Sequence, residues 1–346
     1  MTLHELMKAM EARGLAMEIP PEGAAGAAVA SNWMVRVLLG IMGWLGGLMV
    51  LGFFAIFVQG LLDSIPGLAV LSVSLFIGAY AIYRRAPHHD FANQAALAAS
   101  ICAQALAMVL FFKIAGNSAT ARVALLVAAM QLGLVWLMPN YLHRLVSMLF
   151  AVIALFVAAE RGQWTALVCL VVAGSFVALS FSESRWIARG QVDRVEPAWA
   201  GLALGLLGAG AAHATQIDRT VLLPSTIWTG AALGLVLLGD CAANLMEVPL
   251  RDRLLGGLAA LVFVAAAFGA PGLIACALVL LSAFRSGRKV FVGLALVALL
   301  GTLVAFYYQL DATLLKKSGV LALCGVTMLA AWGVHRWAYP CAKEPT

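Results

Sequence analysis

Charged side chains are scarce in this sequence. Only 11% of its 346 residues are Asp, Glu, Lys or Arg, while 63% are hydrophobic and the mean hydropathy is +0.98. Soluble globular domains carry roughly 25% charged residues. The composition therefore argues against a soluble protein and predicts a chain that resides in a lipid bilayer.

Several motifs of common catalytic and nucleic-acid-binding families are absent. The sequence has no HExxH, no GxSxG, no Walker lysine motif and no basic run interleaved with aromatic residues. It also has no CxxC, and five of its six cysteines lie inside apolar runs, so we expect small buried side chains. We therefore predict no enzymatic activity, no cofactor, no metal site and no nucleic-acid partner.

The sequence does contain a series of continuous apolar runs. A transmembrane helix needs about 20 such residues, and these runs do not alternate as the strands of a β-barrel would. We predict an all-α fold, a polytopic transmembrane helix bundle of about 12 spans. Two runs are short, so the count could fall to ten. The predicted spans cover about 35–62, 66–83, 93–114, 120–138, 141–159, 164–181, 198–212, 225–246, 254–268, 273–284, 290–308 and 312–337.

Two groups of residues inside the spans are suited to helix packing. Gly201, Gly205 and Gly208 are predicted to lie on one close-packing face. Gln104 and Gln131 lie deep in their spans and are predicted to hydrogen-bond between helices.

Polar segments divide the chain into five parts. Residues 1–33 are predicted to form a short amphipathic helix and a linker, because apolar residues recur there at helical spacing. Two six-span halves follow at 34–182 and 198–338. A polar loop over 183–197 separates them, and a short tail covers 339–346.

The N-terminal amphipathic helix is acidic. Four carboxylates and two basic side chains give Met1 to Glu22 a net charge of −2. Helices that bind anionic lipid surfaces are usually basic, so this one is better suited to docking on a protein. A mobile tail is the alternative, and the sequence leaves both open.

The distribution of Lys and Arg predicts the orientation of the spans. With the N-terminus in the cytoplasm and twelve spans, 16 of the 22 basic residues fall in cytoplasmic segments. Cytoplasmic loops of membrane proteins show this excess of positive charge. Both termini are therefore predicted to be cytoplasmic.

Asp240 lies inside an apolar run, about seven residues before Glu247. That places it roughly 10 Å inside the cytoplasmic end of its helix, where an unpaired carboxylate is costly. One interpretation is a proton carrier. The other is a hydrogen-bonded carboxylate that fixes helix packing together with Asn244, one turn further on. The two residues form a candidate intramembrane site.

A second candidate site lies between the last two runs. Lys316 and Lys317 fall on the side that is depleted of basic residues, and in the first turns of a predicted helix, where the helix dipole disfavours cations. One interpretation is an extracytoplasmic site for an anionic headgroup, an anionic ligand or a partner's carboxylate, and an aromatic belt with snorkelling lysines is the alternative. Its candidate residues are Tyr307, Tyr308, Asp311, Thr313, Lys316, Lys317 and Ser318.

The segment YYQLDATLLKKS, followed by GVLALCGVTMLAAW, is similar to the C-terminal motif of a known family. The matching positions are Tyr307, Tyr308, Leu310, Thr313, Leu314, Leu315, Lys317, Ser318 and Gly325. With NWMVRVLLGIMGWLGGLMVLGFF from Asn32, the chain resembles bacterial multi-pass membrane proteins called domain of unknown function 4401, related to family 2157. Asn32 stands where that pattern leads us to expect proline.

The resemblance implies a place in the bacterial inner membrane and assigns no activity. It also implies a partner, a membrane-anchored protein with a GDYxxLxY motif.

Two functions stay open. The first is a non-catalytic membrane subunit that binds a partner protein through the N-terminal helix and the Tyr307–Ser318 region. The second is a transporter-like protein for a small or anionic solute that uses Asp240 with Lys316 and Lys317. We favour the first, because no deep Pro-interrupted pair of spans occurs in matching halves.

Overall fold

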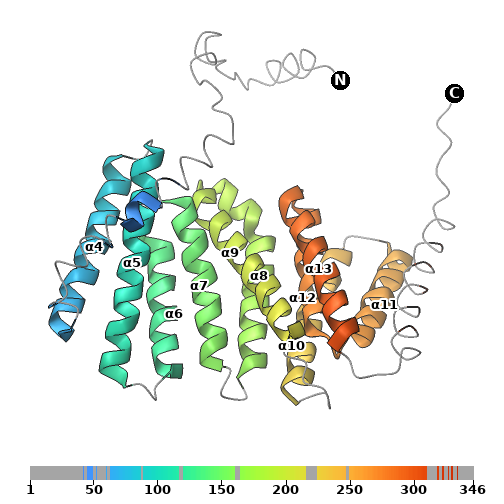
Figure 1. Cartoon of the computed structure of the whole chain (residues 1–346). Helices are drawn as coiled ribbons and strands as arrows, with labels where there is room; N and C mark the ends of the chain where they lie inside the picture. The colour runs from blue at the N-terminus through green and yellow to red at the C-terminus, as the bar shows by residue number, and fades with distance from the viewer. Residues whose placement is uncertain are drawn as a thin grey trace, which may run out of the picture. The chain divides into compact units, whose positions relative to one another are not determined.

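The computed structural model describes residues 63–86, 89–116, 120–159, 164–215, 224–246 and 249–309, with single helical positions at 42, 45–49, 52, 60, 318, 322, 326, 329 and 333. Within these residues the secondary structure is helical and contains no strand (Figure 1). The helices are α4 (Ile65–Arg85), α5 (Asp90–Ala115), α6 (Thr120–Leu137), α7 (Tyr141–Ala159), α8 (Thr165–Ala188), α9 (Val192–Thr215), α10 (Pro224–Leu245), α11 (Leu250–Ala267), α12 (Pro271–Arg285) and α13 (Lys289–Gln309).

The predicted all-α fold class is confirmed for the described residues. Each predicted run from 66–83 to 290–308 corresponds to one helix. Seven of these helices, α4 to α10, are long and apolar enough to cross a membrane, whereas the apolar parts of α12 and α13 are shorter. The helices indicate a membrane protein.

The count of twelve spans stays a prediction. The first and last predicted spans lie mostly outside the described residues. The predicted N-terminal amphipathic helix and the 339–346 tail lie wholly outside them.

The chain forms two compact units. The first comprises Met1–Gln59 and Leu75–Cys102, and the second comprises Gly60–Ser74 and Ala103–Thr346. In the first unit Gly47 lies against α5, because a Cβ added to it would come within 2.8 Å of the Ala98 Cβ. The predicted division into two six-span halves is a statement about the membrane path, and these units do not test it.

The segment predicted as a polar loop over 183–197 is mostly helical, which corrects that expectation. Helix α8 continues to Ala188 and α9 begins at Val192. Gly190, with φ +63°, makes the turn possible, and the Gln191 and Gly190 amides donate to the Trp186 and Ile187 carbonyls. This Schellman cap satisfies the end of α8 within three residues. The polar residues therefore extend the two helices instead of forming a long loop.

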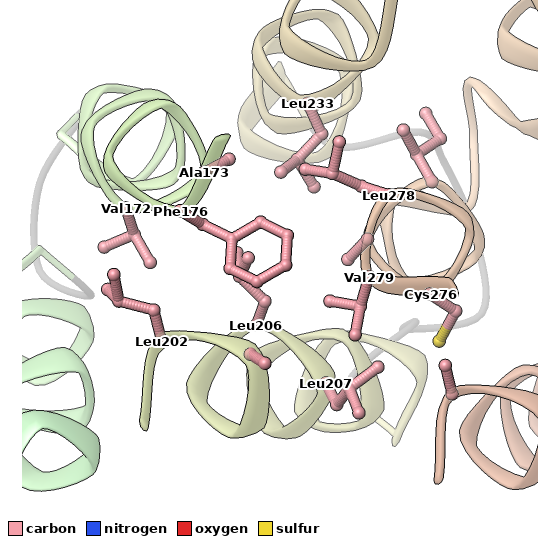
Figure 2. Close-up of a cluster of buried hydrophobic side chains, with 14 of the residues drawn as sticks. Val172, Ala173, Phe176, Leu202, Leu206, Leu207, Leu233, Cys276, Leu278 and Val279 are labelled. Carbon is pink, nitrogen blue, oxygen red and sulfur yellow. The ribbon is translucent and has the colours of Figure 1, made fainter. Parts of the chain in front are cut away.

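Helix α9 is central to the second unit. It packs against α7, α8, α12 and α13, while α10 packs against α8, α11 and α12. Phe176 of α8 lies in the middle of the core, with Leu206 of α9 and Val279 of α12 near its ring (Figure 2). Apolar burial of this kind also holds α12 and α13 together as a helical hairpin (Figure 1).

Glycines set how closely α9 approaches its neighbours. A Cβ on Gly201 would lie 2.7 Å from the Leu145 carbonyl oxygen of α7, and one on Gly205 would lie 2.6 Å from Val152. Gly208 was expected on the same packing face, but a Cβ there meets no atom within 4 Å. Beyond Gly205, α9 instead approaches α12, where a Cβ on Gly210 would lie 3.1 Å from the Cα of Gly272.

Arg144 ties three helix ends together, although only 6% of it is exposed. Its Nε donates to the Met138 carbonyl just after α6 at 2.6 Å, and its Nη1 donates to the Asp193 carbonyl of α9 at 2.8 Å. Pro197 lies four residues after Asp193 and has no N–H, so that carbonyl lacks its usual helical donor. The arginine therefore satisfies backbone groups that the helices cannot satisfy themselves.

Gly201→Ala should destabilise the protein by about 1–3 kcal/mol, because the added methyl group would collide with main-chain atoms of α7. Gly208→Ala is the matched control. It lies on the same helix in open space, and alanine favours helix, so it should be neutral or slightly stabilising. Denaturant-induced unfolding in detergent micelles measures both, and equal effects would contradict the packing described here.

Candidate functional site

Asp240 forms an ion pair with Arg285 between α10 and α12. The carboxylate Oδ1 lies 3.2 Å from the guanidinium Nη1. Arg285 is the last residue of α12, and Asp240 lies five residues before the end of α10. The side chain of Asp240 is 2% exposed and that of Arg285 is 33% exposed. A carboxylate withdrawn from water is thus balanced by a cation that still reaches the surface.

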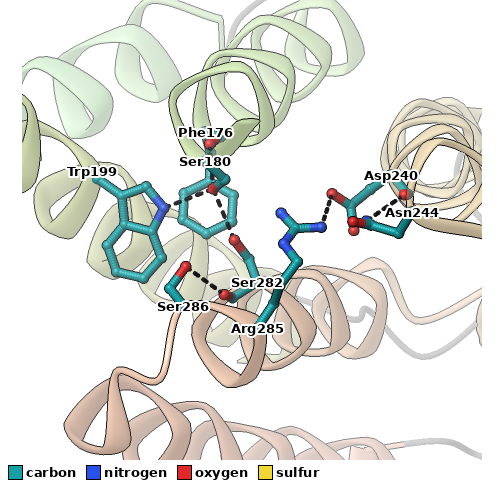
Figure 3. A network of polar contacts seen from close by, with 8 residues as sticks. All are labelled: Phe176, Ser180, Trp199, Asp240, Asn244, Ser282, Arg285 and Ser286. Carbon is teal, nitrogen blue, oxygen red and sulfur yellow. Dashed lines mark hydrogen bonds and ion pairs between the residues drawn. The ribbon is translucent and has the colours of Figure 1, made fainter. Parts of the chain in front are cut away.

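Phe181 and Asn244 complete the surroundings of the pair. The Phe181 ring of α8 lies 4.7 Å from the Arg285 Cζ, which is a favourable cation–π distance. Asn244 Nδ2 donates to the main-chain carbonyl of Asp240 at 2.6 Å. Figure 3 shows Arg285 of α12 directed at Asp240 of α10, with Asn244 beside Asp240. Asn244 therefore supports the Asp240 position from one helical turn away, and the Phe181 contact extends the link from Arg285 to α8.

A second arginine, Arg288, follows three residues later. Its Nη2 lies 2.8 Å from Glu183 Oε1 of α8, and its Cζ lies 4.0 Å from the centre of the Trp199 ring of α9. The turn before it depends on Gly287, with φ +66°. The Arg288 amide donates to the Ala283 carbonyl and the Gly287 amide to the Phe284 carbonyl, a second Schellman cap. This cap directs Arg288 back onto the bundle.

Serines continue the polar contacts between α8, α9 and α12. Trp199 Nε1 donates to Ser180 Oγ at 2.8 Å, and Ser180 Oγ lies 2.8 Å from Ser282 Oγ. Ser286 Oγ donates to the Ser282 carbonyl at 3.0 Å (Figure 3). Each buried hydroxyl or indole N–H therefore has a partner on another helix or one turn away, as polar groups in an apolar interior require.

The two ion pairs have opposite exposure. In the first pair the acid Asp240 is buried and the base Arg285 is partly exposed, whereas in the second pair the acid Glu183 is 36% exposed and the base Arg288 is 18% exposed. The site holds the α12–α13 hairpin to α8 and α10 through charge-assisted hydrogen bonds, and to α9 through the cation–π contact of Arg288 with Trp199. The site contains two arginines and two carboxylates, so it joins the helices and carries no net charge.

The predicted C-terminal site falls largely outside the described residues. Asp311, Thr313, Lys316 and Lys317 all lie there. Tyr307 belongs to α13, but its side chain is outside the described part. The side chain of Tyr308 is exposed at the end of that helix, and Ser318 is helical and exposed. Their role as a binding site stays a prediction.

Sequence analysis missed Arg285, Arg288 and Glu183 as members of the site. Arg285 and Arg288 were counted only among the basic residues that orient the chain, and Glu183 was placed only in the predicted central loop. A usable indication was present, because the predicted topology places Asp240 and Arg285 at the same membrane side, each near the end of its own helix. An intramembrane carboxylate calls for a partner of opposite charge at a similar depth. By contrast, the predicted hydrogen bond between helices by Gln104 and Gln131 is confirmed, at 2.7 Å.

Arg285→Met should lower the free energy of unfolding by about 3–5 kcal/mol, because it leaves the buried Asp240 carboxylate without a counter-charge. Asp240→Asn should cost less, about 1–2 kcal/mol, since the Arg285 side chain is one-third exposed and can turn toward water. Denaturant unfolding in detergent measures these differences.

Two further variants make this test specific to the pair. In the double variant Asp240→Asn/Arg285→Met the loss should be smaller than for Arg285→Met alone. Arg185→Met, an exposed arginine in the last turn of α8, should change stability by less than about 0.5 kcal/mol. Additive effects of the two single substitutions would show that the ion pair does not form.

Comparison with known proteins supplies the family. The family model described as Domain of unknown function (DUF4401) matches residues 32–336, which is most of the chain. No curated protein matches the chain, and no solved structure does. The resemblance inferred from the C-terminal motif is therefore confirmed, and this apolar chain belongs to the DUF4401 family.

Proposed function

We propose that this protein is a non-catalytic subunit of the bacterial inner membrane that binds a partner protein. The observation that carries the proposal is the ion pair between Asp240 and Arg285. The carboxylate that was the best candidate for intramembrane chemistry is used to join two helices. Arg144 and Arg288 are likewise engaged with groups of the chain itself. This pattern supports a fixed scaffold better than a solute path.

The proposed orientation places both termini in the cytoplasm. In the second unit, several helix termini lie at one end, where Arg144, Arg285 and Arg288 make their contacts. These termini are the ends of α6, α8, α10 and α12 and the starts of α7, α9 and α13. Basic residues at this end are Arg144, Arg185, Arg189, Arg194, Arg251, Arg253, Arg285, Arg288 and Lys289. At the opposite end of the unit, the described residues include Lys113 and Arg122. The excess supports a cytoplasmic location for the first end.

The proposed partner surfaces are the acidic N-terminal segment and the Tyr307–Ser318 region. Both are amphipathic or polar stretches that adjoin long apolar runs. A membrane-anchored protein with a GDYxxLxY motif is the proposed partner, on the strength of the family resemblance. Binding would not require chemistry in the membrane interior.

Transport is the second candidate function, and one observation favours it. The Arg285 side chain is one-third exposed, so the ion pair lies near the surface of the bundle at the basic end. Protonation of Asp240 would release Arg285, as in carriers that use an intramembrane carboxylate. In this alternative, Asp240 and the lysines Lys316 and Lys317 would line the solute path.

Proton flux through the purified protein separates the two functions. Proteoliposomes containing the full chain and a trapped pH-sensitive dye should acidify no faster than empty liposomes when a pH gradient and a membrane potential are imposed. Asp240→Asn should leave that rate unchanged. Flux that requires the purified protein and is lost in Asp240→Asn would overturn the subunit proposal in favour of transport.

A second measurement tests partner binding directly. The full chain, co-purified with a co-expressed GDYxxLxY-motif protein, should form a complex of fixed stoichiometry. Replacing Tyr307, Tyr308 and Lys317 by alanine should weaken that complex, while Asp240→Asn should preserve it. A complex that fails to form with any such partner, from membranes in which both proteins are folded, would contradict the proposal.

A further inference from the structure

We propose that the corner between α8 and α9 binds the headgroups of anionic phospholipids. The corner is defined here as residues Glu183 to Arg194. Its three exposed basic side chains are Arg185, Arg189 and Arg194. The inference needs only the membrane location of the protein and is independent of the proposed partner.

The length of the helices places this corner at the membrane surface. Helices α8 and α9 each have 24 residues, which corresponds to about 36 Å. The hydrocarbon core of a bilayer is about 30 Å thick. The continuous apolar part of α8 ends at Phe181, and the four polar residues Ser182 to Arg185 follow it in the last turns of the helix. Those last turns therefore extend about 10 Å further, into the headgroup region.

The corner holds its arginines in a fixed arrangement. Arg185 and Arg189 are four residues apart, so they lie on one face of the last turns of α8. Trp186 lies between them in sequence, with its Nε1 bonded to Ser182 Oγ at 2.8 Å and its ring 5.8 Å from the Arg189 Cζ. The Schellman cap at Gly190 then brings Arg194, at the start of α9, to the same corner.

The local charge balance favours an anion. Among the acidic side chains of the corner, Glu183 is already paired with Arg288. Asp193 is exposed, and its main-chain carbonyl accepts from Arg144. Within the corner, three exposed arginines therefore outnumber the single carboxylate outside that ion pair, Asp193. Guanidinium groups bind phosphate oxygens in a bidentate manner.

Exposed apolar side chains at the corner favour lipid over an acidic protein segment. Ile187 is 58% exposed and Val192 is also exposed, both beside the arginines. A phospholipid offers a phosphate and, directly below it, glycerol and acyl chains that can cover such side chains. Trp186 at this depth matches the aromatic belt of membrane proteins. One lipid molecule thus satisfies both features of the corner.

Native mass spectrometry of the purified full chain tests the proposal. The protein is released from mixed micelles that contain phosphatidylglycerol and phosphatidylcholine in equal amounts. Phosphatidylglycerol should be retained preferentially by the wild type. The triple variant Arg185→Gln/Arg189→Gln/Arg194→Gln should lose that preference, with affinity falling about fivefold per arginine at low ionic strength.

Matched variants and a salt titration keep the test decisive. Lys113→Gln/Arg122→Gln, at the opposite end of the second unit, should retain the preference, and so should the triple Arg→Lys variant in large part. If the triple Gln variant does not fold, raising the salt from 0.05 M to 0.5 M should release phosphatidylglycerol from the wild type. Equal retention of the two lipids by the wild type would overturn the proposal.

A soluble phosphate ester distinguishes a lipid site from a general anion site. Glycerol 1-phosphate, the soluble part of the same headgroup, should leave the thermal unfolding of the wild type unchanged at concentrations where phosphatidylglycerol raises the midpoint. The same rise with glycerol 1-phosphate would show that the corner binds phosphate alone, and the assignment to lipid would then be wrong.

Discussion

Polar side chains inside an apolar bundle must find partners within the chain, and the Asp240–Arg285 ion pair shows how this protein meets that requirement. The carboxylate lies almost wholly out of water, while the guanidinium approaches it from the end of the neighbouring helix. An uncompensated charge in that position would cost several kcal/mol. This contact therefore helps to fix α12 against α10, and with α12 it fixes the α12–α13 hairpin.

The turns of the second unit serve the same purpose. Gly190 and Gly287 each adopt a positive φ and end a helix with a Schellman cap. The cap at Gly287 directs Arg288 onto Trp199 and Glu183. The Asp193 carbonyl has no helical N–H donor, because Pro197 stands four residues later, and Arg144 donates to that carbonyl instead. Arg144 thus donates hydrogen bonds to carbonyls at helix ends that water would satisfy in a soluble protein.

The helices from α4 to α13 could be predicted from the sequence because a membrane span is a simple count of apolar residues. The polar segment 183–197 was assigned to a loop because polarity indicates water and not backbone conformation; it is helical on both sides of Gly190. Asp240 was identified by its apolar surroundings, but its partner was not, since pairing depends on which helices are neighbours. The prediction that Gly208 lies on the packing face was wrong for the same reason, because the relative placement of two helices decides which glycines contact the neighbouring helix.

A structure of the full chain in lipid nanodiscs, determined by electron cryomicroscopy with ordered waters resolved, tests the central claim most directly. The account predicts the Arg285 guanidinium within hydrogen-bonding distance of the Asp240 carboxylate, packed beside Phe181, with α8, α10 and α12 in contact around them. A water-filled cavity that reaches Asp240 while Arg285 points away would contradict it. That result would make the carboxylate part of a solute or proton path.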